Sequence, residues 1–272
     1  MNEMRVTTSD TERGQVSATA AQIYEAFFVP ALFAQWTDVV LNAADVRPRQ
    51  EILDVGCGTG VLARAAAARV GEGGHVAAVD PNDGMLAVAR HAEAGIDWRT
   101  GIAEQLPFPD RSFDRTVSHF ALMFFSDAKA ALAELGRVTR RDGRLALMVW
   151  DQLPNNQGYG RLAALVEDLF GSDAAEAIRA PFRLGDPNLL ADITSNGIAD
   201  PRVVSHHGVA RFESLEAWLH TEIRGWTLAD VLDDEGFAAL LDAARDQLAD
   251  FAEGPGVAFD VSALVVSGPP TG

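Results

Sequence analysis

The chain has 272 residues, of which 48% are hydrophobic and 22% are charged. This apolar content supports a sizeable core and excludes wholesale disorder, and the length suits one large domain. The 39 acidic and 22 basic residues give a net charge of −17, and so acidic a chain repels phosphate backbones, so nucleic acid is not an expected partner.

The single cysteine and the absence of long apolar runs limit the class further. With only Cys57, no intramolecular disulfide and no cysteine-based zinc site can form. The polar N-terminus lacks the apolar core of a signal peptide, and we find no run of about 18 apolar residues that would span a bilayer. We therefore expect a cytoplasmic protein with no membrane partner, and no metal site is apparent.

The N-terminal part predicts a loose segment followed by helices. Residues 1–16 are polar and are expected to fray. From Ala18 to Asn42, apolar residues recur with helical spacing. Pro30 is predicted to divide this stretch into two helices, because proline removes a backbone donor and clashes with the preceding turn.

Short apolar strands then alternate with helices. The expected strands are 51–55, 75–80, 96–100, 113–119 and 144–150, and the expected helices are 61–70, 81–94 and 126–139. Such alternation implies parallel βαβ units with right-handed crossovers. The strands are apolar throughout, as is typical when helices cover both faces of the sheet. The pattern predicts a doubly wound α/β sheet.

The regular alternation of strands and helices ends after Trp150. Helical segments are expected near 161–170, 188–196, 214–226 and 234–252, with Ser214 and Asp234 as N-caps, and strands at 203–212 and 257–267. We expect one compact domain: residues 17–150 hold the N-terminal helices and the core of alternating strands and helices, and residues 151–267 hold the last strands with helical insertions. Residues 268–272 are expected to form a loose tail.

A glycine-rich loop joins the first strand to its helix. The segment runs from Asp54 through Gly56, Cys57, Gly58 and Thr59 to Gly60. Glycines let the backbone approach a ligand, and the helix that follows presents unpaired N–H groups. We expect a nucleotide-like cofactor there.

The loop favours a cofactor other than a dinucleotide. A dinucleotide fingerprint would need glycine where Val61 stands. The acid Asp54 suits a positively charged cofactor and is awkward beside a pyrophosphate. A nicotinamide-dependent oxidoreductase is therefore the less favoured alternative.

A second acid, Asp80, ends the second strand 20 residues after Gly60. A carboxylate there can accept hydrogen bonds from both hydroxyls of a ribose. Taken alone, Asp54 is also typical of a loop cap, and Asp80 of an Asx turn before Pro81. At this spacing the two acids together predict a nucleoside-binding site.

Four segments resemble class I S-adenosylmethionine (AdoMet) dependent methyltransferases of the UbiE-like (methyltransferase type 11) group. They are ILDVGCGTG (52–60), VDPNDGML (79–86), GIAEQLPF (101–108) and LGRVTRRDGRL (135–145), in the family's order and spacing. The resemblance implies a Rossmann-like sheet of seven strands in the order 3-2-1-4-5-7-6. Strand 7 would be antiparallel, and a helical cap would cover the site.

The resemblance also implies roles at the matching positions. The cofactor would be AdoMet, converted to S-adenosylhomocysteine. Its contacts would be Asp54, Gly56, Cys57, Gly58, Thr59 and Gly60 for the methionine and ribose, Asp80 for the ribose hydroxyls, Pro81, Asn82, Ala103 and Glu104 around the adenine, and Ser118 and His119 beside the methyl group. Cys57 itself is expected to be a packing residue, because it has no positive partner to lower its pKa.

The substrate site is expected between the N-terminal helices and the cap. His119 is the best-placed candidate for a general base, with a role in the pocket wall as the alternative. His206 and His207 should face opposite sides of a strand. The residues expected to line an apolar substrate pocket are Tyr24, Phe28, Trp36, Met123, Trp150, His206, Trp218 and Trp226.

The sequence thus predicts methyl transfer to an O, C or N atom of a small organic molecule, aromatic or of secondary metabolism. An enzyme that binds AdoMet without transferring methyl, such as a cyclase, is the first alternative, and a non-catalytic AdoMet-binding partner is another. The terminal segments typical of quinone-methylating members are not recognisable, so that substrate is not carried over. The methylated atom stays open, as does the choice between monomer and homodimer.

Overall fold

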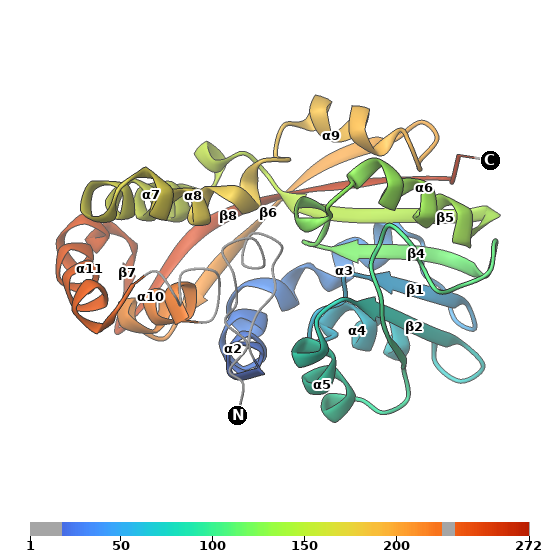
Figure 1. Cartoon of the computed structure of the whole chain (residues 1–272), viewed down its shortest axis with the longest axis horizontal. Helices are drawn as coiled ribbons and strands as arrows, with labels where there is room; N and C mark the ends of the chain where they lie inside the picture. Colours follow the sequence, from blue (N-terminus) through green and yellow to red (C-terminus); the bar gives the residue numbers. More distant parts are fainter. Residues whose placement is uncertain (1–17, 225–231, 272) are drawn as a thin grey trace.

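The computed structural model describes residues 18–224 and 232–271, which form an α/β domain around one mixed sheet (Figure 1). The strands run in the order β3-β2-β1-β4-β5-β8-β6, and β7 pairs only with β8. Their bounds are β1 (Glu51–Val55), β2 (His75–Asp80), β3 (Asp97–Thr100), β4 (Phe113–His119), β5 (Thr139–Trp150), β6 (Arg202–Phe212), β7 (Ala252–Glu253) and β8 (Gly256–Gly268).

The predicted strand order is confirmed, with β8 in the place of the predicted seventh strand. β8 is antiparallel to both β5 and β6, whereas the pairs among β1 to β5 are parallel. The two-residue β7 is an addition that makes eight strands instead of seven. Residues 1–16, predicted to fray, lie outside the described part of the chain.

Helices cover both faces of the sheet (Figure 1). One face carries α3 (Thr37–Ala43), α4 (Val61–Val70) and α5 (Asp83–Ala92), and the other carries α6 (Ala128–Val138) and α9 (Pro187–Thr194). The chain winds outward from β1 to β3 and then crosses to β4 and β5. Right-handed crossovers make this reversal change the covered face, and in folds of this kind the ligand crevice lies at such a point, here at the carboxyl ends of β1 and β4.

The predicted break at Pro30 is wrong. The chain runs from α2 (Ala18–Ile23) through the π-helix η1 (Tyr24–Phe33) and the short 3₁₀ helix η2 (Ala34–Trp36) into α3, with Pro30 inside η1. A proline removes the bond to the residue four positions back and crowds that carbonyl. Proline also lacks the N–H for the i→i−5 bond of a π-helix, so the helix continues through Pro30 with one backbone donor missing.

Helix caps differ from the predictions at two places. α5 begins at Asp83, two residues later than expected, because the Asn82 side chain accepts the Met85 N–H and caps it. α11 (Asp234–Gln247) is capped by Asp233 and not by Asp234. The predicted cap Ser214 is confirmed before α10 (Leu215–Arg224), since its hydroxyl accepts the Ala217 N–H at 2.9 Å.

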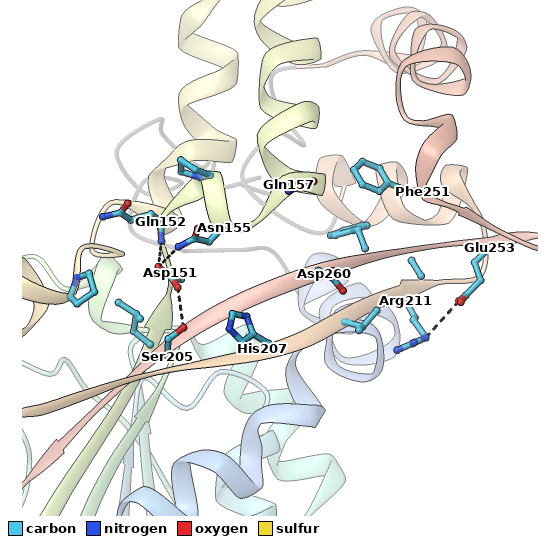
Figure 2. A pocket seen from close by; sticks show the side chains of 16 residues that line it. Asp151, Gln152, Asn155, Gln157, Ser205, His207, Arg211, Phe251, Glu253 and Asp260 are labelled. Atoms are coloured by element: carbon cyan, nitrogen blue, oxygen red, sulfur yellow. Dashed lines mark hydrogen bonds and ion pairs between the residues drawn. The ribbon is translucent and has the colours of Figure 1, made fainter.

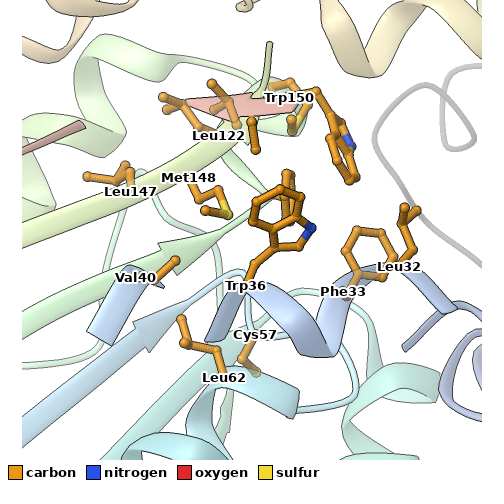
Figure 3. Packing of buried hydrophobic residues seen from close by; sticks show 14 of the residues in the cluster. Leu32, Phe33, Trp36, Val40, Cys57, Leu62, Leu122, Leu147, Met148 and Trp150 are labelled. Atoms are coloured by element: carbon orange, nitrogen blue, oxygen red, sulfur yellow. The ribbon is translucent and has the colours of Figure 1, made fainter. Parts of the chain in front are cut away.

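The N-terminal helices fold their aromatic side chains over the end of the sheet (Figure 3). Trp36 is buried and meets the Trp150 ring edge-on, and Phe120 stacks on Trp150 with ring centroids 4.0 Å apart. By length and composition alone, the described stretch Ala20–Ala43 could cross a membrane. In the structure its side chains Leu32, Trp36 and Val40 belong to the buried core.

The strands β6 and β8 extend past the sheet as a two-stranded ribbon. β8 pairs with β5 only from Ala263 to Gly268, whereas it pairs with β6 along its length. The ribbon carries a cap of four helices, α7 (Gln157–Phe170), α8 (Ser172–Arg179), α10 and α11 (Figure 1). Short 3₁₀ turns in this part of the chain are η4 (Leu153–Asn155), η5 (Ala180–Phe182) and η6 (Ala249–Phe251), and a further one, η3 (Leu122–Phe124), follows β4. The helical insertion predicted between the last two long strands is confirmed.

The C-terminal tail is not loose as predicted. The Pro269 carbonyl accepts the Ala199 N–H at 2.8 Å, and the Thr271 N–H donates to the Gly197 carbonyl at 3.0 Å. These bonds tie the described part of the tail to the turn after α9.

The contrast between two helical leucines tests this core. Leu132 of α6 is fully buried, whereas Leu189 of α9 is 43% exposed. Leu132→Ala should lower the free energy of unfolding by about 2–5 kcal/mol, because it leaves a cavity, and Leu189→Ala should change it by less than about 0.5 kcal/mol. Urea unfolding followed by circular dichroism measures both, and equal losses would contradict the assigned packing.

Candidate cofactor and substrate site

The glycine-rich loop after β1 opens a space at the carboxyl end of the sheet. Gly56, Gly58 and Gly60 all have positive φ, at +72°, +53° and +89°. A Cβ added to Gly60 would lie 2.3 Å from the Trp98 ring, so this position needs glycine for close packing. A Cβ on Gly58 would meet nothing within 4 Å, so the loop borders open space there.

Asp80 ties this loop to the turn before α5. Its Oδ2 accepts the Gly58 N–H at 2.8 Å, and its Oδ1 accepts the Asn82 N–H at 2.8 Å. Burial raises the pKa of Asp80 to about 6, and the two N–H groups oppose that rise. Each carboxylate oxygen has a second lone pair, so Asp80 can still accept two hydroxyl groups of a ligand.

Asp54 is a buried acid whose oxygens lack hydrogen bonds. Neither oxygen has a well-formed partner among the described residues, although the Ala63 N–H lies near enough to favour the charged form. Burial, with the nearby charge of Asp80, raises the pKa of Asp54 to about 8. A buried carboxyl without partners is costly unless a ligand supplies donors or positive charge.

His119 ends β4 and faces the same crevice. His119 as a whole is partly exposed, but its Nε2 atom is buried and has no hydrogen bond within the described chain. The hydroxyl oxygen of Thr59 is likewise buried without a hydrogen bond there. Burial lowers the pKa of His119 to about 3, so the ring is neutral at neutral pH. Because Nε2 has no partner in the described chain, it can hydrogen-bond a ligand, and the role of general base stays a prediction.

Other predicted cofactor contacts serve the fold as well. The Ser118 hydroxyl donates to the Val55 carbonyl at 2.8 Å and so joins β4 to β1. Cys57 is buried, and burial together with the charges of Asp80 and Asp54 raises the pKa of its thiol well above the ordinary value. The thiol is therefore protonated, as expected of a packing residue.

The predicted adenine segment lies after β3. Ala103 is buried, whereas Pro81 is exposed. Glu104 is half-buried and accepts the Asp127 N–H through its Oε1 at 3.1 Å. Ile102 beside them is 49% exposed, which is unusual for so large an apolar side chain and leaves an apolar surface next to the expected adenine.

An aromatic cavity adjoins this crevice. Eight of its thirteen lining residues are aromatic, and Glu222 is the one charged residue among them. The cavity and the crevice share two wall residues, Phe120 and Phe33. Phe120 directly follows His119, and the centroid of the Phe33 ring lies 6.1 Å from that of His119. Tyr24 also lines the cavity. Burial raises the pKa of Tyr24, and the charge of Asp80 adds to this rise. The cavity volume is about 50 Å³, which is room for a few waters.

The structure sorts the predicted pocket residues into two groups. Tyr24, Phe28 and Trp150 line the aromatic cavity. Trp36, Met123 and Trp218 do not line it, because their side chains are packed in the core behind it, and His206 instead lines a shallow groove beside Arg202 and Arg144. Trp226 lies outside the described residues.

Sequence reasoning missed two polar members of the cavity. Tyr159 on α7 and Glu222 on α10 meet there, and the Tyr159 hydroxyl donates to Glu222 Oε1 at 2.7 Å. Neither belongs to a recognisable motif, so the one available signal was an acid within the otherwise apolar face of an amphipathic helix.

A larger groove of about 880 Å³ runs along the ribbon, between η4, β6 and β8 (Figure 2). His207 lies in it, on the opposite face of β6 from His206. Its buried acid Asp151 is saturated, with Oδ1 accepting from Gln152 and Asn155 and Oδ2 from Ser205 and Ser262. This cluster therefore has a structural role. Within residues 18–224 and 232–271, no group of three His, Cys, Asp or Glu side chains could hold a metal ion.

Comparisons with known proteins agree with this geometry. A family model described as a methyltransferase domain matches residues 53–147. The ubiquinone/menaquinone biosynthesis C-methyltransferase UbiE of Paraburkholderia phymatum is 37% identical over 164 residues, which cover 54% of this chain and 68% of that protein. The chain belongs to the class I AdoMet-dependent methyltransferases. Within that family it falls in the UbiE-like group.

Two further relatives show how far the likeness extends. The UbiE of Bordetella avium is 38% identical over 122 residues, 43% of this chain and 48% of that protein, so the chain spans about half the length of this relative. A putative methyltransferase from an antibiotic biosynthesis pathway of Anabaena variabilis has a TM-score of 0.63 at 21% identity, covering 86% of this chain and 97% of that one. The second likeness shows the fold alone.

The residues at the crevice fit the family's cofactor, AdoMet. The unpaired oxygens of Asp54 suit the positively charged groups of AdoMet, the free lone pairs of Asp80 suit a ribose, and the loop borders open space at Gly58. The roles of the individual residues stay predictions.

Asp54→Asn tests the electrostatics of the crevice in the cofactor-free protein. The folded-state pKa of Asp54, about 8, exceeds its ordinary value of 3.8. The folded protein therefore holds a proton that the unfolded chain releases, so this group costs stability increasingly from pH 4 to pH 8. The variant should gain at least about 1 kcal/mol at pH 8 and much less at pH 5, and should bind S-adenosylhomocysteine at least about tenfold more weakly.

Thermal unfolding at several pH values and calorimetric titration measure these effects. Asp173→Asn, at an exposed position of α8, is the matched control and should change neither quantity. An Asp54→Asn protein that is less stable than the wild type at pH 8 would contradict the assignment.

Proposed function

We propose that this protein transfers the methyl group of AdoMet to an O, N or C atom of a small organic substrate by direct displacement. One observation supports this most strongly: the aromatic cavity and the crevice with unpaired polar atoms share walls at Phe33 and Phe120. A substrate in the cavity would therefore lie next to the cofactor. AdoMet, when bound, supplies an electrophilic methyl group on a sulfonium.

The chain's own residues contribute binding and orientation. Asp80 and the loop at Gly58 would hold the nucleoside, and Asp54 would ionise beside a positively charged group of the bound cofactor, because that charge lowers its pKa. The aromatic walls exclude water and align the nucleophile, and such positioning can supply most of the rate enhancement of a displacement. Neutral His119 would hydrogen-bond a bound group at the end of β4.

The substrate is proposed to be an aromatic or secondary-metabolite molecule. The relatives from Bordetella and Paraburkholderia are named as quinone C-methyltransferases, but their matches cover only 43% and 54% of this chain. Tyr159, Phe182 and Glu222 of the cavity lie beyond the family match, which ends at residue 147. Since these residues shape the cavity, the relatives' substrate is not extended to this chain.

Calorimetric titration with S-adenosylhomocysteine tests the cofactor site. The wild type should bind at micromolar affinity and should not bind NAD. Asp80→Ala should weaken binding at least about tenfold, because it removes the acceptor for the ribose and releases the Gly58 and Asn82 N–H groups. Asp246→Ala, on the exposed side of α11, should bind like the wild type. Preference for NAD, or unchanged affinity in Asp80→Ala, would refute the assignment.

Turnover is tested with methyl-labelled AdoMet and a panel of small aromatic alcohols and amines. Mass spectrometry should find a labelled methyl group on at least one panel member, together with S-adenosylhomocysteine. A substrate changed without gaining the label would favour an AdoMet-binding enzyme of another reaction type, such as a cyclase.

A further inference from the structure

The aromatic cavity is lined by one carboxyl side chain, Glu222, which has no role in the mechanism above. Glu222 is 6% exposed and lines the cavity from α10. The Tyr159 hydroxyl donates to its Oε1 at 2.7 Å, and the Trp218 indole N–H donates to the same atom at 3.3 Å. Both donors use Oε1, so in the described chain Oε2 has no hydrogen bond.

This arrangement differs from that of a structural acid. Both oxygens of Asp151, the buried acid of the ribbon groove, are occupied by donors. Buried carboxylates that only stabilise a fold are normally saturated in this way. In Glu222, Oε1 accepts two hydrogen bonds and Oε2 accepts none from the described chain, which is typical of a carboxylate that binds a ligand.

The walls of the cavity determine which ligand Glu222 can accept. No arginine or lysine of the described chain lines the cavity, so an anionic group would meet a carboxylate with no compensating charge. Aromatic rings such as those of Phe33, Trp150 and Phe182 attract cations through their π faces. A carboxylate among aromatic rings is therefore complementary to an organic ammonium.

We propose that Glu222 recognises an amine group of the substrate, with Oε2 accepting a hydrogen bond from the ammonium and Tyr159 and Trp218 fixing the carboxylate. The inference rests on the proposed function in taking the occupant of the cavity to be the substrate. It narrows the substrate class to amines on an apolar or aromatic body and excludes carboxylates and phosphates. A ring-sized body enters with rotation of the aromatic side chains, because the cavity is small.

The ionisation of Glu222 gives this recognition a pH dependence. Burial raises the pKa of Glu222 to about 7, whereas Tyr159 and Trp218 favour the charged form. The other titratable groups that face the cavity are Tyr159 from α7 and Tyr24 from η1, and burial raises the pKa of both well above neutral. No charged side chain from the described parts of α2, η1, β6, β8 or α11 changes the pKa of Glu222.

The test uses three probes of one shape: benzylamine, benzyl alcohol and phenylacetate. Their affinities for the full chain are measured by ligand-observed NMR titration, with and without S-adenosylhomocysteine. The wild type should bind benzylamine at least about tenfold more tightly than benzyl alcohol and should not bind phenylacetate. Glu222→Gln should lose the preference for benzylamine, and Glu216→Gln, the exposed matched control on the same helix, should retain it.

Equal affinity for benzylamine in the wild type and in a folded Glu222→Gln protein would overturn the proposal. Should that variant not fold, the wild type alone decides, because benzylamine stays protonated below pH 8. Its affinity should fall about eightfold from pH 7.5 to pH 6 as Glu222 takes up a proton, while that of benzyl alcohol should not change. A flat profile for benzylamine would also overturn it.

The two proposals fail separately. Binding of S-adenosylhomocysteine without a preference for benzylamine refutes the role of Glu222 and leaves the proposed function standing. A preference for benzylamine that depends on Glu222, without binding of S-adenosylhomocysteine, refutes the proposed function and leaves the cation site standing.

Discussion

The burial of two neighbouring acids at the end of β1 and β2 is the constraint on which the crevice depends. The parallel register sets Val55 beside Val79, so Asp54 and Asp80 lie close together at one edge of the sheet. Burial raises the pKa of Asp54, and the charge of Asp80 adds to that rise. The rigid core holds them there, and a ligand that brings donors and positive charge would relieve the cost. Such a ligand binds the folded state alone and so also stabilises it.

The ribbon formed by β6 and β8 has the corresponding role for the substrate cavity. Phe259 of β8 lies under both sides of the cap, with its ring 5.6 Å from that of Tyr159 and 4.4 Å from that of Trp218. A Cβ at Gly158 would lie 2.4 Å from the Phe259 ring, so glycine lets α7 approach the ribbon closely. The two cap helices thereby converge, and Tyr159 reaches Glu222 although 63 residues separate them.

The cofactor half could be predicted from the sequence because its signals are local. The loop 54–60 and Asp80 sit at strand ends, and strand ends can be found from apolar runs and glycines. The order of the first five strands follows from parallel crossovers and the family resemblance. Pro30 was misjudged because the usual rule considers only the α-helix, whereas the chain adopts π winding there.

The cavity could not be predicted in the same way, because it is made by segments distant in the sequence. The apolar pattern predicts burial for both Trp36, on a helix, and Trp150, at the end of a strand, yet Trp150 lines the cavity and Trp36 fills the core beside it. That difference depends on how the N-terminal helices and the cap meet over the sheet. The one local signal at Glu222, an acid within an apolar helix face, does not identify a buried site, since an acid on an amphipathic helix is ordinarily solvated.

The distribution of buried charge connects the two halves of the site. The charged side chains that are buried within the described residues are all acids: Asp54, Asp80, Asp151 and Glu222. Asp151 is saturated by its neighbours, so the buried carboxyl groups with open lone pairs are concentrated at the crevice and in the cavity beside it. In an interior of low dielectric constant such charge discriminates strongly by sign. In the cavity a phosphate or carboxylate would oppose this field, whereas a sulfonium in the crevice and an ammonium in the cavity would each be favoured. The net charge of −17 adds to the same preference at long range.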